Sequence, residues 1–228
     1  MLERFLMWLG FGLCHQLPER SFFGGGVQVP VCARDTGIYI GLVISLAVLA
    51  LIERGRRPDE LPRWPVLALG VAFVGAMGLD GVTQLLGLRE STNDLRLITG
   101  LMTGYAISLG LVPVFNMQVW KTSQPRHLLE RPRSVLAWLA TLPVAFAVVR
   151  WVLPFLGVGF PVLVALAVLG AFTSVNLAVV CLFPPFERRS ERLRDAWLPM
   201  LIALALTLGE LWLTGMLKPA LISAAGGV

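Results

Sequence analysis

Two of the three cysteines and one of the two histidines in this chain lie in a short polar segment near its start. Cys14 and His15 are adjacent, and Cys32 and Asp35 are three residues apart. Thiolate, imidazole and carboxylate groups are the usual ligands of zinc, and structural zinc sites hold four of them in a tetrahedron. We therefore expect Cys14, His15, Cys32 and Asp35 to converge on zinc or another divalent transition metal.

Two other interpretations of this segment remain open. The cysteines and the histidine can be buried and hydrogen-bonded in a capped loop without a metal, or Cys14 and Cys32 can act as a redox pair or a disulfide in an oxidising compartment. Cys14 and His15 can reach one ion only if a helix ends at them, because neighbouring helix residues point in different directions. Pro18 favours such an end. The run Gly24-Gly25-Gly26 allows the chain to fold back towards Cys32.

A second group of polar residues interrupts the apolar stretches that follow. Ionisable residues in membrane spans usually pair or line a cavity, because they are costly there. We therefore expect an ion pair between Asp80 and Arg96, which either only locks two helices or belongs to a functional pocket. In the functional interpretation Asp80 and Glu210 act as acid and base. The substrate would then be bound by Gln84, Ser91, Asn93, Arg96, Thr99 and Arg150.

The composition is that of an integral membrane protein. Of the 228 residues, 56% are hydrophobic and 14% are charged, whereas soluble domains average about 45–50% and about 25%. A helix needs about 20 mostly apolar residues to cross the hydrocarbon core. The uncharged runs predict an all-α polytopic membrane bundle, a single domain with spans at 35–53, 65–87, 94–120, 134–153, 158–183 and 196–217.

The ends of the chain and one internal break complete this prediction. Residues 5–17 are too short to span and predict an interfacial helix within the segment 1–34, and residues 218–228 form a tail. Pro154 and Gly157 predict the turn that divides the uncharged run 151–186. Gly100 and Gly104 have the spacing of a close helix contact.

The basic residues predict the orientation of the bundle. The loops 54–63, 121–133 and 187–195 contain twelve of the 19 Lys and Arg residues. Cytoplasmic loops carry an excess of Lys and Arg, so we expect these loops in the cytoplasm and the Cys14–Asp35 segment outside the cell membrane. The net charge of +5 is then a topology signal. The chain has no nucleic-acid-binding motif, and membrane lipids are its expected surroundings.

Four stretches of the chain together form a recognisable sequence signature. They are CHQLPERSF at 14–22, QVPVCARDTGIY at 28–39, DGVTQ at 80–84 and STNDLRLITG at 91–100. They resemble the signature of a prokaryotic integral-membrane family known as domain-of-unknown-function family 2085, over roughly residues 10–120. In that family a cysteine commonly stands at the position of Asp35. The resemblance implies a site of three thiolates and one imidazole, which Asp35 changes to two thiolates, an imidazole and a carboxylate. It implies no reaction.

Three functions remain open at this point. The first is a membrane enzyme that acts on a lipid or isoprenoid, with the metal polarising a phosphate, an ester or water. The second is an accessory or assembly protein in which a closed structural metal site pins the N-terminal segment to the bundle. The third is a transporter of a metal or small solute, although no polar track crosses the membrane. A pocket open beside the ligands would favour the enzyme.

Overall fold

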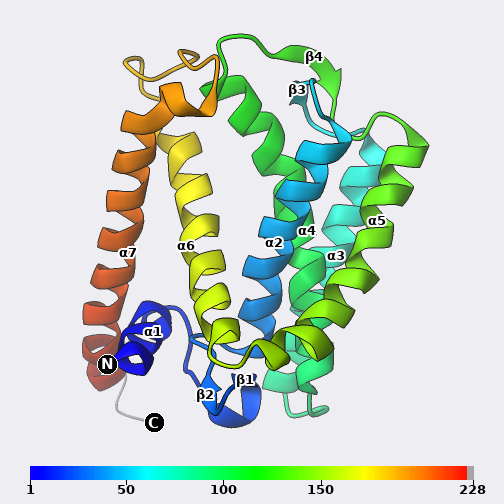
Figure 1. The fold of residues 1–228 in the computed structure, drawn as a ribbon. Coiled ribbons are helices and arrows are strands. Elements are labelled where there is room, and N and C mark those ends of the chain that lie inside the picture. The colour runs from blue at the N-terminus through cyan, green and yellow to red at the C-terminus, as the bar shows by residue number, and fades with distance from the viewer. Residues whose placement is uncertain (225–228) are drawn as a thin grey trace.

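The bundle consists of seven α-helices within residues 1–224, the part of the chain that this computed structural model describes, with side chains as far as Pro219 (Figure 1). The helices are α1 (Leu2–Phe11), α2 (Ala33–Ile52), α3 (Trp64–Leu85), α4 (Asn93–Val119), α5 (Pro132–Ala147), α6 (Gly159–Val180) and α7 (Trp197–Ala224). Six of them, with short extensions of the fifth and the last, are long and apolar enough to cross a membrane. The predicted all-α, multi-pass membrane fold is confirmed.

The predicted spans match these helices to within a few residues, except at the end of the chain. The last span was expected to end at residue 217, but α7 continues to Ala224. The first residues of the predicted tail are therefore helical. Residues 225–228 of that tail lie outside the described residues.

The contact between α2 and α4 forms the centre of the bundle. It is a backbone-to-backbone contact, because glycines lie where the helices meet. A Cβ atom on Gly100 would lie 2.1 Å from the carbonyl oxygen of Arg34, and one on Gly104 would lie 2.3 Å from that of Ile38. The close helix contact predicted for these two glycines is present.

The turn after α5 also forms where it was predicted. A five-residue π-helix, η2 (Val148–Val152), and a 3-10 turn, η3 (Leu153–Leu156), lead to Gly157, whose φ of +58° suits glycine. The hairpin of β1 (Phe23–Gly24) and β2 (Val27–Gln28) packs on this turn, since a Cβ on Gly24 would lie 2.3 Å from the Gly157 carbonyl oxygen. The glycine run thus folds the chain back as expected.

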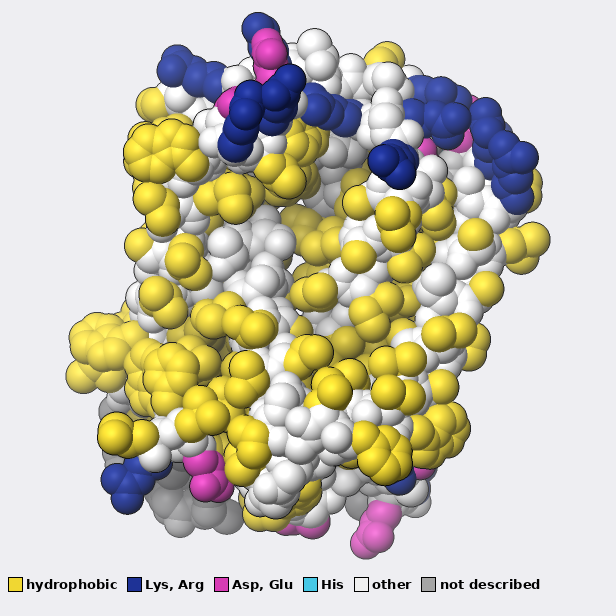
Figure 2. All heavy atoms as spheres, viewed as in Figure 1, with side chains coloured by type: hydrophobic (Ala, Val, Ile, Leu, Met, Phe, Trp, Pro, Cys, Tyr) yellow, Lys and Arg dark blue, Asp and Glu magenta, His cyan; other side chains and the backbone are white. Residues whose placement is uncertain are grey.

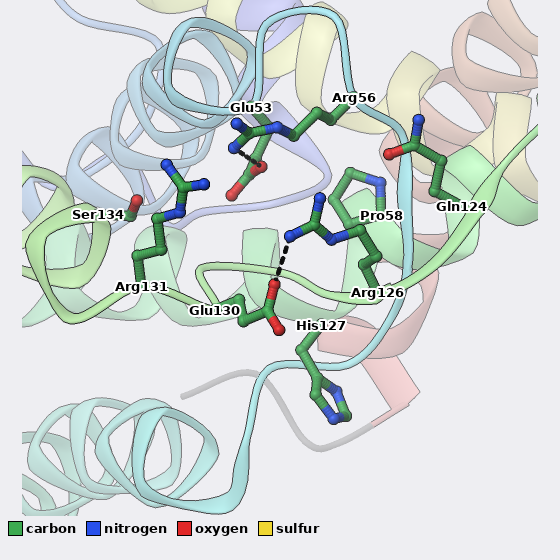
Figure 3. Close-up of a pocket in the computed structure, with 9 residues that line it drawn as sticks. All are labelled: Glu53, Arg56, Pro58, Gln124, Arg126, His127, Glu130, Arg131 and Ser134. Atoms are coloured by element: carbon green, nitrogen blue, oxygen red, sulfur yellow. Dashed lines mark hydrogen bonds and ion pairs between the residues drawn. The ribbon is translucent and has the colours of Figure 1, made fainter.

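The three arginine-rich loops meet at one end of the bundle, where Figure 2 shows a concentration of Lys and Arg. β3 (Pro58–Glu60) pairs in parallel with β4 (Gln124–His127), and Lys121 N donates to Ser190 O at 3.0 Å. The depression between the first two loops (Figure 3) is closed by ion pairs such as Arg126–Glu130 at 2.8 Å. It has room for about 10 Å³, no more than one water molecule. It is a narrow junction between loops.

The N-terminal helix α1 lies at the opposite end, beside α7 (Figure 1). Leu6 and Leu9 are buried against Ala165 of α6 and Leu211 of α7. The interfacial helix was expected to reach residue 17, near Pro18, but it ends at Phe11. Lys218 Nζ of α7 donates to the carbonyl oxygens of Phe11 at 2.7 Å and Cys14 at 2.5 Å. These bonds satisfy carbonyls that a helix end leaves free.

Candidate functional site

Three of the four predicted ligands come together at this end of the bundle. One ligand atom each from Cys14, Cys32 and Asp35 lies within 4.8 Å of the other two. The Cys32 thiol donates to Asp35 Oδ2 at 3.2 Å, and the sulfur of Cys14 accepts a hydrogen bond from the backbone N–H of Cys32, also at 3.2 Å. Both cysteines are free thiols in this structure.

Cys32 and Asp35 are positioned by the start of α2, where Cys32 is the N-cap and Asp35 lies in the first turn. Cys14 is brought to them by a clamp around Gln16. The side-chain amide of Gln16 donates to the carbonyl oxygens of Met7 at 2.6 Å and Pro30 at 2.7 Å. It therefore ties α1 to the segment between β2 and α2, which holds Cys14 against Cys32.

His15 does not join this group. It is exposed and lines the same pocket, but its ring nitrogens are not among the mutually close ligand atoms. The chain is no longer helical here, Lys218 donates to the Cys14 carbonyl, and the Cys14 side chain is buried while that of His15 is exposed. The fourth ligand that we expected from His15 is therefore absent from the cluster.

The two thiols differ in acidity. Hydrogen bonding, first with the Cys32 side chain and then with the backbone N–H groups of Gln16 and Cys32, lowers the pKa of Cys14 to about 7 against the opposing effect of burial. The pKa of Cys32 is raised, first because its thiol is hydrogen-bonded to Cys14 and then because it is buried beside Asp35. Cys14 is therefore the thiol that more readily becomes a thiolate, the form that binds metals.

A cavity of about 200 Å³ opens beside the cluster. Its walls combine the thiol and carboxylate groups with three arginines from separate parts of the chain. It is lined by Leu13, Cys14, His15, Leu17, Arg20, Cys32, Arg34, Asp35, Gln84 and Arg96. Two of the predicted substrate-binding residues, Gln84 and Arg96, thus share a pocket with the predicted ligands.

The prediction that Asp80 pairs with Arg96 is wrong, because Asp80 pairs with two other arginines. Asp80 is 1% exposed and pairs with Arg34 at 2.5 Å and Arg89 at 2.6 Å, and the Ser91 hydroxyl donates to it at 2.8 Å. Arg34 reaches across from α2 and passes Gly81, where a Cβ would make an ordinary contact with Arg34 Nη1 at 3.8 Å. Asp80 holds three segments together and does not line the pocket.

We call Asp80 with Arg34, Arg89 and Ser91 the lock around Asp80. The remaining predicted residues lie near this lock or farther from it. Thr99 donates to a carbonyl oxygen of its own helix, that of Leu95, at 2.8 Å. Arg150 pairs with Asp94 at 2.5 Å. Glu210, on α7, accepts a hydrogen bond from Asn176 of α6 at 2.9 Å. None of these three residues lines the pocket of the cysteine cluster.

Sequence reasoning missed Arg20 and Arg34 as pocket residues, and Arg89 as a partner of Asp80. The first two stand inside the signature stretches at 14–22 and 28–39, and that position was the available signal. No local pattern indicates the role of Arg89, which depends on how the loop after α3 folds back.

Comparison with known proteins places the signature stretches in a family. The family model described as "Predicted membrane protein (DUF2085)" matches residues 14–109. The chain is 38% identical over 109 residues to an uncharacterised protein of Methanocaldococcus jannaschii, covering 48% of this chain and 67% of that protein. It is 40% identical over 97 residues to an uncharacterised protein of Methanothermobacter thermautotrophicus, covering 42% of this chain and 82% of that one. No solved structure matches. With its cysteine cluster and the lock around Asp80 both inside the shared region, the chain belongs to the DUF2085 family of predicted membrane proteins.

Proposed function

We propose that this chain is a membrane metalloenzyme that holds zinc, or another divalent transition metal, on Cys14, Cys32 and Asp35 and acts on an anionic lipid or isoprenoid. The supporting observation is that these three donors converge on one wall of a pocket. Ligands at zinc distances of about 2.0–2.3 Å in a tetrahedron lie about 3.5–3.8 Å apart. The three atoms, mutually within 4.8 Å, need only a small contraction to reach that geometry.

The pocket favours a catalytic over a purely structural site. Structural zinc sites close four protein ligands around the ion, whereas catalytic sites have three and leave the fourth position to water or substrate. Here three donors face a cavity of about 200 Å³. A metal bound there would polarise a phosphoryl or carbonyl oxygen or acidify a water. In the accessory-protein alternative the metal site would instead be closed by four protein ligands.

The residues left to move a proton differ from those first expected. Asp80 is held by two arginines, and Glu210 lies on α7, hydrogen-bonded to Asn176. His15 lines the pocket, is exposed, and is the imidazole available there. We therefore assign the general acid–base role to His15 in this proposal.

A transporter has less support from the same geometry. Directly below the pocket, Ile40 of α2 and Leu97 and Leu101 of α4 are buried at 0–3% exposure. The glycine contacts bring the two helix backbones together at this level. A polar solute would find no continuing path between α2 and α4.

We further propose that the pocket faces the extracytoplasmic side. The three arginine-rich loops gather at the other end of the bundle (Figure 2), as the positive-inside rule requires of cytoplasmic loops. In intact cells we expect a membrane-impermeant maleimide to add one label to Glu90→Cys and none to Arg189→Cys, relative to the wild type. Both positions are exposed in the structure. Labelling of Arg189→Cys from outside would reverse the orientation.

Elemental analysis of the purified protein tests the metal site. In neutral detergent and under reducing conditions, we expect about one zinc per chain in the wild type and far less than stoichiometric zinc in Cys14→Ser, Cys32→Ser and Asp35→Ala. Cys181→Ser is the matched control, because Cys181 is buried at the end of α6 away from the cluster. Asp35→Cys should keep the metal, since a thiolate replaces the carboxylate as ligand.

Two results would contradict the proposal. One is a wild-type protein without metal whose Cys14 and Cys32 are joined in a disulfide by mass spectrometry, which would favour a redox pair. The other is equal zinc content in the wild type and in all three ligand variants, which would place the metal elsewhere.

A further inference from the structure

We infer that the pocket beside the cysteine cluster binds a phosphate-type oxyanion, held chiefly by Arg96 with Arg20 and Arg34. This inference deepens the proposed function by naming the charged group of its substrate. The inference depends on the proposed function only where it concerns the part that the bound anion plays in a reaction. The binding itself depends on the arginines.

Arg96 is the central observation. It belongs to the first turn of α4 and is 7% exposed. Its guanidinium makes one hydrogen bond within the described part of the chain, from Nη1 to Asn93 Oδ1 at 3.0 Å, and it has no carboxylate within 4.0 Å there. A guanidinium carries five N–H donors, so most of them lack a protein acceptor. Burying such a charge without a counter-ion is costly.

The other arginines at this end show that Arg96 is different. Arg34 and Arg89 share Asp80, and Arg150 pairs with Asp94. Each of these three has a carboxylate partner, whereas Arg96, the most deeply buried of the four, has none in the described structure. Arg20 has no carboxylate partner there either, but its side chain is exposed. Arg96 is therefore the buried cation whose counter-charge is left to a ligand.

The walls of the cavity around Arg96 support an anion. Arg20 and Arg34 line it as well, and Asp35 is the acidic residue among the lining positions. One nitrogen of Arg34, Nη2, already donates to Asp80, and its Nε is buried without a hydrogen-bond partner in the structure. The cavity thus presents more positive charge than negative charge, and Arg96 brings N–H donors that have no protein acceptor in the described structure.

The chemistry of these donors points to a phosphate group. Guanidinium groups bind phosphate oxygens with paired N–H donors, and a phosphate can accept from several arginines at once. Gln84, from the end of α3, adds an amide to the same wall. A phosphate bound here would lie in the same small cavity as Cys14, Cys32 and Asp35. It would be presented either on a lipid headgroup or on a water-soluble phosphate compound.

Calorimetric titration of the purified full-length protein tests the inference. The probes are inorganic phosphate and dioctanoyl phosphatidic acid, each added to protein in a neutral detergent. We expect Arg96→Gln to weaken binding of both probes at least about tenfold, because a charge-assisted hydrogen bond is lost. Arg150→Gln is the matched control, with the same change of charge at the same end of the bundle, and should bind within about twofold of the wild type, as expected for a residue outside the pocket.

The two probes also identify the source of the anion. Phosphatidic acid that binds at least about tenfold more tightly than phosphate would indicate a lipid headgroup, and equal affinities would indicate a soluble phosphate compound. Equal affinity of the wild type and Arg96→Gln, or no heat from either probe with the wild type, would overturn the inference.

The titration is repeated with Cys14→Ser to separate this inference from the metal site. Phosphate binding retained in this variant, which the metal proposal expects to lack zinc, supports an anion site that does not depend on the metal. A wild-type protein that binds phosphate but contains no zinc would refute the metal site alone. A wild-type protein with one equivalent of zinc and no phosphate binding would refute the anion site alone. Arg96→Lys gives a further check on folding, since it keeps the charge and should retain part of the affinity.

Discussion

Asp80→Asn is expected to lower the free energy of unfolding by about 3 kcal/mol, the lower end of the cost of removing one partner from a buried ion pair. Asp80 is 1% exposed, and its two oxygens accept from Arg34, Arg89 and Ser91. An amide would leave two arginines without their shared negative charge. We expect the lower end of the range because the side chains of Arg34 and Arg89 are 23% and 39% exposed and stay partly hydrated.

The matched control is Asp94→Asn. Asp94 also pairs with an arginine, Arg150, but both side chains are exposed, and exposed ion pairs contribute about 0–1 kcal/mol. Unfolding by sodium dodecyl sulfate in mixed micelles measures both variants. If Asp80→Asn is no less stable than Asp94→Asn, Asp80 does not lock α2, α3 and the following loop together.

Gly100→Ala is expected to destabilise the bundle by about 2 kcal/mol, the middle of the range for overpacking a tight contact. Its Cβ would lie 2.1 Å from the carbonyl oxygen of Arg34, so the backbone of α2 must move away from α4. Arg34 lies between Cys32 and Asp35 at the start of α2, so the displaced backbone would carry both of these ligands away from Cys14. We therefore expect weaker zinc binding in the same variant, although Gly100 touches no ligand.

Gly110→Ala, farther along α4, is the control for this prediction. A Cβ there has no atom within 4 Å, so the variant gains about 1 kcal/mol of helix propensity or less and should keep its zinc. Both variants are compared by unfolding in mixed micelles and by elemental analysis. Equal stability and equal zinc content of the two variants would show that the α2–α4 contact does not position the site.

Much of the fold could be predicted from the sequence because, in lipid, the backbone N–H and C=O groups of the protein must find their hydrogen-bond partners within each span. The uncharged runs therefore located the six spans, and Pro154 and Gly157 located the turn between α5 and α6. The length of α1 could not be predicted, because it depends on Lys218. That residue lies at the other end of the chain and caps the helix from α7.

The candidate site was predictable in its composition and less so in its pairing. Cys14, Cys32 and Asp35 were identified from their types and spacing alone, since few other residues could bind a metal at this end. The partner of Asp80 was not predictable, because the sequence places three arginines at the same end of the bundle as Asp80. They are Arg34, Arg89 and Arg96. The choice depends on how α2 and the loop after α3 are placed around Asp80 and on the direction of each long side chain.

X-ray absorption at the zinc edge of the purified wild-type protein tests the central claim most directly, because it reports the atoms bound to the metal. The account predicts two sulfur neighbours at about 2.3 Å and lighter oxygen or nitrogen neighbours at about 2.0–2.2 Å. In Asp35→Cys it predicts three sulfur neighbours, and in Cys14→Ser no zinc at one equivalent. A wild-type zinc surrounded only by oxygen and nitrogen, unchanged in Asp35→Cys, would contradict the metal site on Cys14, Cys32 and Asp35.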